Sequence, residues 1–448
     1  MNDALIARCE ARVPRYTSYP TAPHFGAGVD AERYRAWLGA LGARSLSIYV
    51  HVPFCARLCW FCGCHTRVIN AYEPVTRYVT TLLDEARAVS EAIGAAGPVR
   101  HVHWGGGTPT NLAPADVARL ADGLRRDFAF ADDAEFAVEI DPRTLTQGVV
   151  AALSEAGVNR ASLGVQDFDP AVQAAINRHQ SFAVTARAIE GLRRAGITRI
   201  NIDLMYGLPG QTEAGVERTV DQAVGLAPDR LALFGYAHVP WLKRHQALID
   251  AASLPDAGAR FRQATAAAER LVGHGYVAIG LDHFARAQDD LAVAACTGRL
   301  RRNFQGYTTD AADALIGLGA SAIGALPEGY AQNEVAVAAY AAAVKEHGLA
   351  VARGVALDDD DRLRRDAIER LMCDLAVDLD AVAGRHGRES EVFADALPAL
   401  EPLVADGLVR IDGARVTVTE SGRPFLRLAA AAFDRYLGAG QGRHAAAV

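Results

Sequence analysis

The stretch HVPFCARLCWFCGC, residues 51–64, decides the fold and chemistry of this 448-residue chain. Three of its cysteines, Cys55, Cys59 and Cys62, follow the spacing C-x3-C-x2-C. Three thiolates can bind three irons of a cubane cluster and leave the fourth iron free to bind a small molecule. We therefore predict a [4Fe-4S] cluster on these three cysteines, with Cys64 beside the cluster rather than ligating it.

A zinc site and a disulfide framework are the alternatives for these cysteines. Structural zinc is usually held by two separated cysteine pairs, whereas Cys9, Cys296 and Cys373 stand alone. A chain of this length buries a core without disulfides, and its cysteine count of 7 is odd. The cluster is therefore favoured over zinc, and its free thiolates require a reducing compartment.

Composition restricts the partners and the location. The net charge of -7 argues against a general nucleic-acid binder, which would carry a basic face. An anionic small substrate needs only a few cations, and here these are mostly arginines because Lys243 and Lys345 are the only lysines. No apolar run reaches the ~20 residues of a membrane span, and the N-terminus lacks the pattern of an export signal. We expect a cytoplasmic protein with no membrane span.

Short apolar segments alternate with longer amphipathic segments between residues 44 and 240. The expected strands are residues 45–52, 99–104, 135–140, 160–165, 199–205 and 230–236. The expected helices are residues 72–93, 115–128, 149–156, 183–195 and 213–226. This alternation predicts an α/β fold with a parallel sheet built from βαβ units. Six such units make an incomplete (β/α)6 barrel rather than the full set of eight.

Polar residues or glycines stand where the expected strands end. The first strand runs into the cysteine loop and the second into the segment GGGTP, residues 105–109. The remaining strands carry or end in Glu139, Gln166, Asp203 and the segment YAH, residues 236–238. Any one of these is most simply a turn residue. Because the carboxyl ends of parallel barrel strands meet at one rim, together they predict a site there.

The last third of the chain has a different pattern. Residues 276–286 read as one strand that ends in polar side chains. An acidic helix is expected to start in residues 358–361, followed by a helix over 393–405 and a hairpin turn at Asp412-Gly413. We therefore divide the chain into an N-terminal arm (1–43), a catalytic barrel (44–357) and a mostly helical, winged-helix-like C-terminal domain (358–448). The acidic balance favours packing of this domain against the barrel over DNA binding.

The cysteine loop, with Phe61 before its third ligand, resembles the signature of the radical S-adenosylmethionine superfamily. The similarity to one of its families, oxygen-independent coproporphyrinogen III oxidase (coproporphyrinogen dehydrogenase), runs through nearly the whole chain. The segments that carry it are residues 14–21, 49–64, 103–110, 164–168, 201–209, 236–240, 282–286 and 303–309. The resemblance implies a radical-enzyme (β/α)6 barrel with an N-terminal arm and a helical C-terminal domain.

The resemblance also implies an anaerobic step of haem (porphyrin) biosynthesis. Two propionates of coproporphyrinogen III would be oxidatively decarboxylated to vinyl groups, giving protoporphyrinogen IX. A 5′-deoxyadenosyl radical, made from S-adenosylmethionine at the cluster, would remove the hydrogen. The implied partners are coproporphyrinogen III and an electron donor such as flavodoxin or ferredoxin. A monomer is the family expectation.

Members of this family bind two S-adenosylmethionine molecules, and matching motifs assign residues to each. The residues implied for the first cofactor site are Tyr49, Gly106, Glu139 and Ile323. Those implied for the second are Phe61, Gly107, Thr108, Gln166, Arg178, Asp203 and Ala237. The resemblance places Gln305 in contact with the substrate or the cofactors.

Two other functions remain open from the sequence. A haem chaperone of the same superfamily would bind haem rather than convert a porphyrinogen. The segments at residues 280–286 and 303–309, together with Cys64, favour the oxidase. An iron–sulfur DNA-binding regulator is suggested by the winged-helix-like C-terminus, but a basic recognition face is missing.

Overall fold

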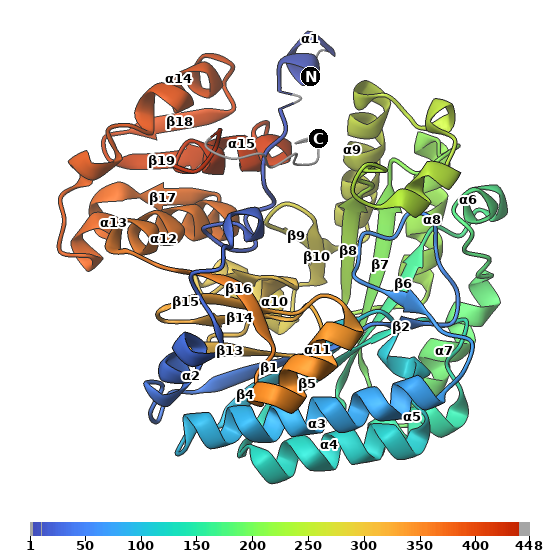
Figure 1. The fold of residues 1–448 in the computed structure, drawn as a ribbon. Coiled ribbons are helices and arrows are strands. Elements are labelled where there is room, and N and C mark those ends of the chain that lie inside the picture. The colour runs from blue at the N-terminus through green and yellow to red at the C-terminus, as the bar shows by residue number, and fades with distance from the viewer. Residues whose placement is uncertain (1–2, 10, 439–448) are drawn as a thin grey trace.

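A single 12-stranded sheet forms the centre of the computed structural model, which describes residues 3–9 and 11–438 (Figure 1). The strand order is β16-β15-β14-β13-β1-β4-β5-β6-β7-β8-β10-β9. The parallel strands are β13 (Ala314–Leu318), β1 (Leu46–Val52), β4 (Val99–Gly106), β5 (Phe130–Ile140), β6 (Arg160–Gln166), β7 (Arg199–Tyr206) and β8 (Arg230–Gly235). The antiparallel strands at the two sides are β14 (Ile323–Leu326), β15 (Gly329–Asn333), β16 (Val351–Ala356), β10 (His283–Arg286) and β9 (Tyr276–Ile279). The edge strands β16 and β9 are not neighbours in this order, so the barrel is incomplete, as predicted.

Helices cover the outer face of the parallel strands (Figure 1). They are α3 (Glu73–Ile93), α4 (Pro114–Asp127), α5 (Gln147–Glu155), α7 (Phe182–Arg194), α8 (Glu213–Gly225) and α9 (Ala257–Gly273). The short helix α6 (Pro170–Ala175) instead packs in an apolar cluster with Trp60 and Phe61 of the cysteine loop. The expected strands and helices between residues 44 and 240 are all present. Their ends differ by one or two residues, except that β5 begins at Phe130 instead of Glu135. None of the helices described is long and apolar enough to span a bilayer.

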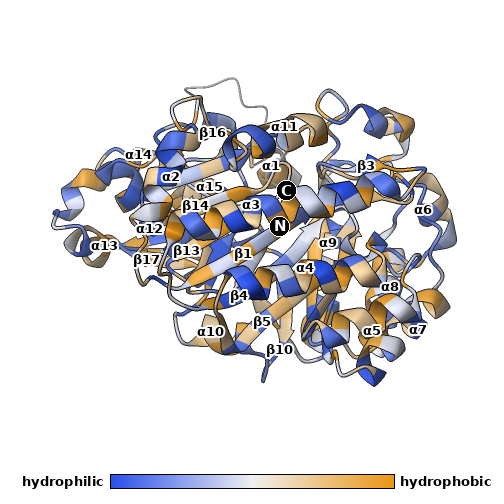
Figure 2. Ribbon diagram, turned by 60° about the horizontal axis from the view of Figure 1, so that its bottom comes forward, coloured by the Kyte–Doolittle hydropathy of each residue, from blue (hydrophilic) through white to orange (hydrophobic). Residues whose placement is uncertain are grey.

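The alternation of side chains along the parallel strands creates two environments. Apolar residues at every second position, such as Val102, Val138 and Ile202, join the main core with the surrounding helices. These helices carry hydrophobic and hydrophilic residues side by side (Figure 2). The strand positions that alternate with these apolar residues are mostly polar and include Glu139 and Asp203. Their side chains line a cavity of about 210 Å³ inside the barrel. The sheet therefore encloses a polar cavity instead of a packed interior.

Residues 276–286 form two strands, not the single strand that the sequence predicted. Strands β9 and β10 pair antiparallel, with Ile279 opposite His283. Gly280, in the turn between them, has a φ of +53°, which favours glycine. A Cβ atom there would also lie 2.0 Å from the ring of Tyr307. The prediction was wrong because the turn is short, and its two turn-forming residues, Gly280 and Asp282, were taken as part of one strand with a polar end.

The C-terminal region combines helices with a small sheet. Its elements are α12 (Asp359–Asp374), β17 (Ala376–Asp378), α13 (Leu379–Arg385), α14 (Leu397–Ala405), β18 (Val409–Asp412), β19 (Arg415–Val418) and α15 (Leu426–Ala431). The acidic helix begins as expected, because Asp358 Oδ1 accepts a hydrogen bond from Asp361 N (2.7 Å) in a capping box. Strands β18 and β19 form the expected hairpin. The helix expected from residue 393 begins only at Leu397, after a 3-10 turn over Ser390–Phe393.

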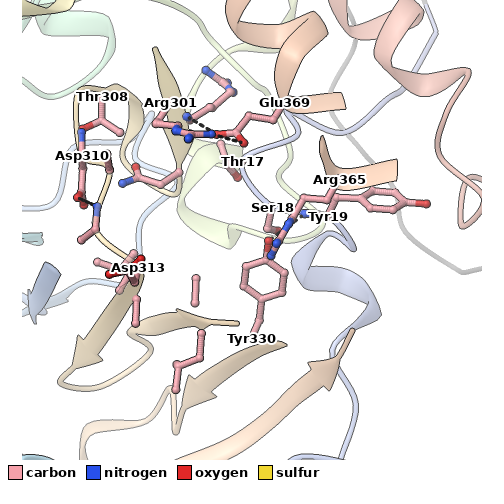
Figure 3. Close-up of a pocket in the computed structure, with 18 of the residues that line it drawn as sticks. Thr17, Ser18, Tyr19, Arg301, Thr308, Asp310, Asp313, Tyr330, Arg365 and Glu369 are labelled. Atoms are coloured by element: carbon pink, nitrogen blue, oxygen red, sulfur yellow. Dashed lines mark hydrogen bonds and ion pairs between the residues drawn. The ribbon is translucent and has the colours of Figure 1, made fainter. Parts of the chain in front are cut away.

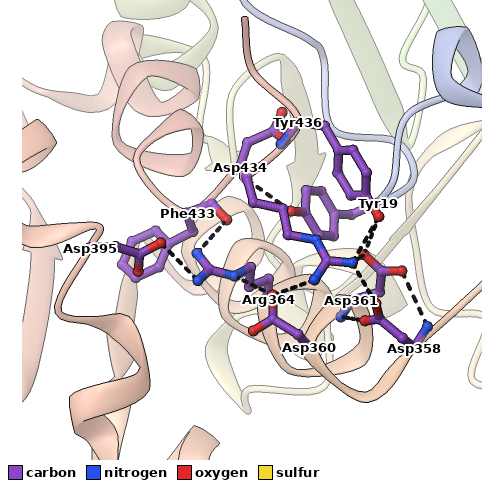
Figure 4. A network of polar contacts seen from close by, with 10 residues as sticks. Tyr19, Asp358, Asp360, Asp361, Arg364, Asp395, Phe433, Asp434 and Tyr436 are labelled. Carbon is purple, nitrogen blue, oxygen red and sulfur yellow. Dashed lines mark hydrogen bonds and ion pairs between the residues drawn. The ribbon is translucent and has the colours of Figure 1, made fainter. Parts of the chain in front are cut away.

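The N-terminal arm packs into the core of the C-terminal region. Tyr16 and Tyr19 are 4% and 1% exposed and belong to the same hydrophobic cluster as residues of α12 and α15. Tyr16 OH donates to Asp434 Oδ2 (3.1 Å). The backbone N of Arg435 donates to Tyr19 OH (3.0 Å), and Figure 4 shows Tyr19 beside the polar network of this region. The Arg435 guanidinium also bridges the acidic start of α12, at Asp361 Oδ1 (2.9 Å). The two ends of the chain therefore share one hydrophobic core.

A buried carboxylate joins helix α3 to the sheet. Glu85 Oε2 accepts hydrogen bonds from Gly319 N (2.7 Å) and Tyr340 OH (2.6 Å), and Oε1 accepts one from Asn333 Nδ2 (2.6 Å). Burial raises the pKa of Glu85 to about 7, although these donors act in the opposite direction.

This pKa makes stability depend on pH. The folded chain holds the Glu85 proton to higher pH than the unfolded chain, so the free energy of unfolding should fall as pH rises from 4.5 to about 7. We expect Glu85→Gln to remove this part of the slope in chemical denaturation measured between about pH 5 and about pH 8. Glu91→Gln, at an exposed position of the same helix, is the control. Equal slopes for the parent and the Glu85 variant would contradict the assignment.

Candidate active site

The predicted cluster ligands lie on the loop that follows β1, at the carboxyl end of the barrel strands. Cys55 ends the short strand β2 (Phe54–Cys55), which pairs in parallel with β3 (Arg67–Val68) and so joins the two ends of the loop. Inside the loop, Cys62 N donates to Cys59 O (3.2 Å). Cys59 is buried, whereas Cys55 and Cys62 are partly exposed. The three thiols are therefore held on one folded loop.

Loops that follow neighbouring strands hold the cysteine loop in place. After β4, Thr108 Oγ1 donates to Cys55 Sγ (3.5 Å). After β6, Asn177 Nδ2 donates to Leu58 O (2.8 Å). Gly107 lies so close to the start of the loop that a Cβ atom there would be 2.8 Å from Phe54 N, and a substitution would force the two segments apart.

Two arginines point at the sulfur of Cys59. Arg143 Nη2, after β5, donates to Cys59 Sγ (3.2 Å), and Arg178 Nη1, after β6, donates to the same sulfur (3.4 Å). Asp141 pairs with both, at 2.6 Å from Arg143 Nη2 and 3.6 Å from Arg178 Nη2. The Nε of Arg178 is buried with no hydrogen-bond partner among the described residues. The guanidinium groups thus supply positive charge and a free donor beside this thiol.

This donor set fits an iron–sulfur cubane. Among the described residues, no three His, Cys, Asp or Glu side chains converge as ligands of a single metal ion would. A cubane does not require such convergence, because each thiolate binds a different iron. Hydrogen-bond donors to the cysteine sulfurs also suit a cluster, whose sulfurs carry negative charge. The loop can therefore hold the cluster that the spacing predicts.

Residues predicted for the first cofactor site form a connected polar network. Glu139 Oε2 accepts a hydrogen bond from Gly106 N (3.0 Å), and Oε1 is 3.2 Å from His103 Nε2. The Tyr49 ring stacks on His103 with centroids 5.9 Å apart, and Tyr49 OH is hydrogen-bonded to His51 Nδ1 (3.0 Å). Gly106 has a φ of +102°, and a Cβ atom there would lie 2.3 Å from the His51 ring. Only glycine fits at this position.

Two carboxylates of the cavity have different proton affinities. Burial and the negative charge of Glu139 together raise the pKa of Asp203 to about 6, although hydrogen bonds from Ser162 and Asn201 act in the opposite direction. Burial also raises the pKa of Glu139, but the hydrogen bond and charge of His103 and the Gly106 N–H outweigh this and leave the pKa below its usual value. Glu139 is therefore ionised at neutral pH, while Asp203 titrates close to neutrality.

The other predicted residues fall into three groups. Gln305 lines the barrel cavity together with Glu139 and Asp203. Phe61 packs in an apolar cluster with Tyr236, the residue before Ala237. The remaining two residues lie at strand ends. Gln166 is the last residue of β6 and has a φ of +72°. Ile323 is the first residue of β14 and lies beside Gly317, the residue of β13 that pairs with Tyr49. The structure thus brings most of the set to the cavity or to the cysteine loop above it.

A larger cavity of about 360 Å³ adjoins the barrel cavity, because Asn303, Thr308, Asp310 and Leu315 line both. It is enclosed by the N-terminal arm, the hairpin of β11 (Arg301–Asn303) and β12 (Gly306–Thr308), and helix α12, and its lining includes Tyr19 and Arg365 (Figure 3). It borders Ala314, where β13 begins, at the opposite end of the barrel from the cysteine loop. None of the predicted site residues, all of which the structure describes, lines it.

Several residues of the site were not predicted from the sequence. Arg143 could have been found from its place just after a strand end. Ser162 and Asn201, which donate to Asp203, stand at the inward positions of their strands, so strand alternation was the available signal. Ion pairs also lie where β6 and β8 begin, with Arg160 and Glu135 2.9 Å apart and Arg230 and Asp289 2.6 Å apart. No local motif marks these pairs.

Comparison with known proteins gives matches along the whole chain. The Radical SAM superfamily matches residues 49–223, and the HemN C-terminal domain matches residues 357–425. The oxygen-independent coproporphyrinogen III oxidase of Bradyrhizobium diazoefficiens is 52% identical over 447 residues, covering 100% of this chain and 99% of the relative. The enzyme of the same name from Paracoccus denitrificans is 46% identical over 439 residues, which cover 98% of this chain and 97% of that relative. The solved structure of coproporphyrinogen III oxidase (HemN) from Escherichia coli, described as a radical SAM enzyme, is 39% identical, with a TM-score of 0.92 over 97% of this chain and 99% of that one.

Proposed function

The chain belongs to the oxygen-independent coproporphyrinogen III oxidases of the radical SAM superfamily, and we propose that it oxidatively decarboxylates two propionates of coproporphyrinogen III to vinyl groups, giving protoporphyrinogen IX. Its cofactors are a [4Fe-4S] cluster and S-adenosylmethionine. The observation that carries this function is similarity over the full length, C-terminal domain included, to enzymes of that name. Nothing in these matches favours the haem chaperone or the DNA-binding regulator.

The cysteine loop and the arginines beside it hold the cluster in this proposal. When bound, the cluster and S-adenosylmethionine supply a 5′-deoxyadenosyl radical that takes a hydrogen atom from the propionate. Cys55, Cys59 and Cys62 are the ligands. Arg143 and Arg178 place positive charge at Cys59 Sγ, which favours the addition of an electron to the site.

The polar residues of the barrel divide between two S-adenosylmethionine molecules. Glu139, ionised at neutral pH, offers a carboxylate to the first molecule, together with Tyr49, Gly106 and Ile323. Asp203 serves the second molecule. The other residues proposed for the second site are Phe61, Gly107, Thr108, Gln166, Arg178 and Ala237. Backbone groups beside glycine can approach a ligand closely, which suits Gly106 and Gly107 for this role.

Buried ion pairs lie at the amino end of the barrel strands. The side chains of the Arg160–Glu135 and Arg230–Asp289 pairs are at most 15% exposed. Gln305 lies on the cavity wall, where it can contact the substrate. A site with few exposed groups leaves a reactive radical fewer competing hydrogen donors.

The proposal also covers the electron donor, the oligomeric state and the cellular compartment. A donor of flavodoxin or ferredoxin type supplies electrons to a monomeric enzyme. The cytoplasm is the proposed compartment, because cluster thiolates require reducing conditions.

An anaerobic assay tests the function. Purified enzyme, coproporphyrinogen III, S-adenosylmethionine and a reductant should yield protoporphyrinogen IX, with one deoxyadenosine formed for each vinyl group. Both products are measured by chromatography, the porphyrinogen after oxidation to the porphyrin. Retention of haem by the protein without any vinyl product would favour the chaperone instead.

A further inference from the structure

The segment at residues 239–249, between β8 and α9, covers the outside of the cysteine loop. His245 Nε2 is hydrogen-bonded to the carbonyl oxygen of Cys62 (2.7 Å). Lys243 Nζ donates to the carbonyl oxygen of Cys64 (3.1 Å). This segment, which we call the cover segment, is therefore one hydrogen bond away from a cluster ligand.

The inner side of the cover segment is fixed. Gln246 is 1% exposed, its Nε2 donates to Phe61 O (2.9 Å), and its Oε1 accepts from Val239 N (2.6 Å). Ile249 is 3% exposed and packs in the apolar cluster that contains Phe61. The cover segment is thus attached to the cysteine loop by buried hydrogen bonds and apolar packing.

The outer side of the same segment is apolar and exposed. Trp241 is 49% exposed, Leu242 68% and Leu248 59%. Three large apolar side chains so close together on a surface are typical of a site of protein contact. None of residues 239–249 lines the barrel cavity, so these side chains do not belong to the cavity inside the barrel.

Basic residues lie beside the apolar side chains, and the exposed Asp250 follows the segment directly. Lys243 and Arg244 belong to the cover segment, and the Arg12 guanidinium lies 5.5 Å from the centre of the Trp241 ring. The segment contains no Asp or Glu. In a chain with a net charge of -7 and only two lysines, this surface is locally positive.

We propose that the cover segment is the docking surface of an acidic one-electron carrier protein. This inference rests on the proposed function, which requires a protein donor for the cluster. In each encounter the carrier loses one electron and the enzyme gains it. An apolar centre with basic residues beside it is complementary to a carrier whose acidic rim surrounds an exposed redox group. His245 then places the carrier beside the backbone of Cys62.

A binding experiment tests the surface without measuring turnover. Oxidised flavodoxin, the probe carrier, is titrated anaerobically into the cluster-loaded enzyme by calorimetry. Leu242→Gln combined with Arg244→Glu should raise Kd at least about tenfold, because the pair loses apolar contact and gains repulsion. The matched control is Leu397→Gln combined with Arg388→Glu, at exposed positions of the C-terminal region, and should leave Kd unchanged. Added salt should weaken binding of the parent more than binding of the variant.

A kinetic measurement separates this surface from the catalytic function. Cluster reduction, followed by the change in visible absorbance, should slow in the variant with reduced flavodoxin but match the parent with dithionite, which needs no docking. Neither readout uses coproporphyrinogen III, so a failure of the proposed reaction would not alter them. An unchanged Kd would overturn the inference. A higher KM for coproporphyrinogen III with dithionite would also overturn it and assign the surface to the substrate.

Discussion

Replacement of Cys55, Cys59 or Cys62 by Ser should remove the cluster and reduce product formation to background. A serine hydroxyl is far less acidic than a thiol and does not supply the anionic sulfur ligand that iron prefers. At Cys59 the loss is compounded, because Arg143 and Arg178 would face a neutral hydroxyl instead of a thiolate. Iron and sulfide content after anaerobic purification, with the visible spectrum, measures the outcome.

Two other cysteines serve as controls for this prediction. Cys64→Ser, in the same loop, should keep the iron content, because we place Cys64 beside the cluster and not among its ligands. Cys296→Ser, at an exposed position outside the loop, should keep both iron and activity. Stoichiometric zinc without iron in freshly prepared anaerobic protein would contradict the cluster assignment.

Asp203→Asn should fold, keep the cluster and bind only one S-adenosylmethionine, with product formation lost. A buried carboxylate in an ion pair would make this change costly, about 3–5 kcal/mol. Among the described residues, however, the hydrogen-bond partners of Asp203 are the neutral Ser162 Oγ (3.0 Å) and Asn201 Nδ2 (2.8 Å). An asparagine can keep both by accepting from Asn201 and donating to Ser162, so we expect a stability loss of about 1 kcal/mol.

Equilibrium binding under anaerobic conditions measures this second prediction. The parent should bind two equivalents of S-adenosylmethionine and the variant one. Because the pKa of Asp203 is about 6, the second equivalent should weaken in the parent as the pH falls below that value. Asp310→Asn, the same change on the cavity wall, should leave two equivalents bound. A variant of Asp203 that binds two equivalents, or does not fold, would give this residue a structural role only.

The parallel part of the fold could be predicted because strands and helices alternate there with distinct hydrophobic periods. Strand β13 was missed, since it lies in a glycine-spaced segment and pairs in parallel with β1, about 270 residues earlier. The β9–β10 hairpin was misread for a related reason, because a short turn leaves little trace in a hydrophobic run. Pairing partners distant in sequence are not encoded in a local pattern.

The site shows the same division between local and distant information. The cysteine spacing predicted the cluster loop, the expected strands pointed to Glu139 and Asp203, and the resemblance supplied Arg178. The contact of Arg178 with Cys59 spans 119 residues of sequence, and no periodicity could reveal it. The proton affinities of Glu139 and Asp203 likewise depend on burial and on neighbours from other strands, which only the folded barrel defines.

The joining of the two chain ends has a consequence for biosynthesis. Tyr16 contacts Asp434 across 418 residues, so one half of this contact is synthesised 418 residues before the other. The aromatic side chains of the arm lack their final packing partners until the C-terminal region, which follows the barrel in the sequence, has been synthesised. Contacts of such long range form slowly and leave apolar surface open to association with other chains. The enzyme therefore completes this hydrophobic core only after the whole segment from Tyr16 to Asp434 has been synthesised.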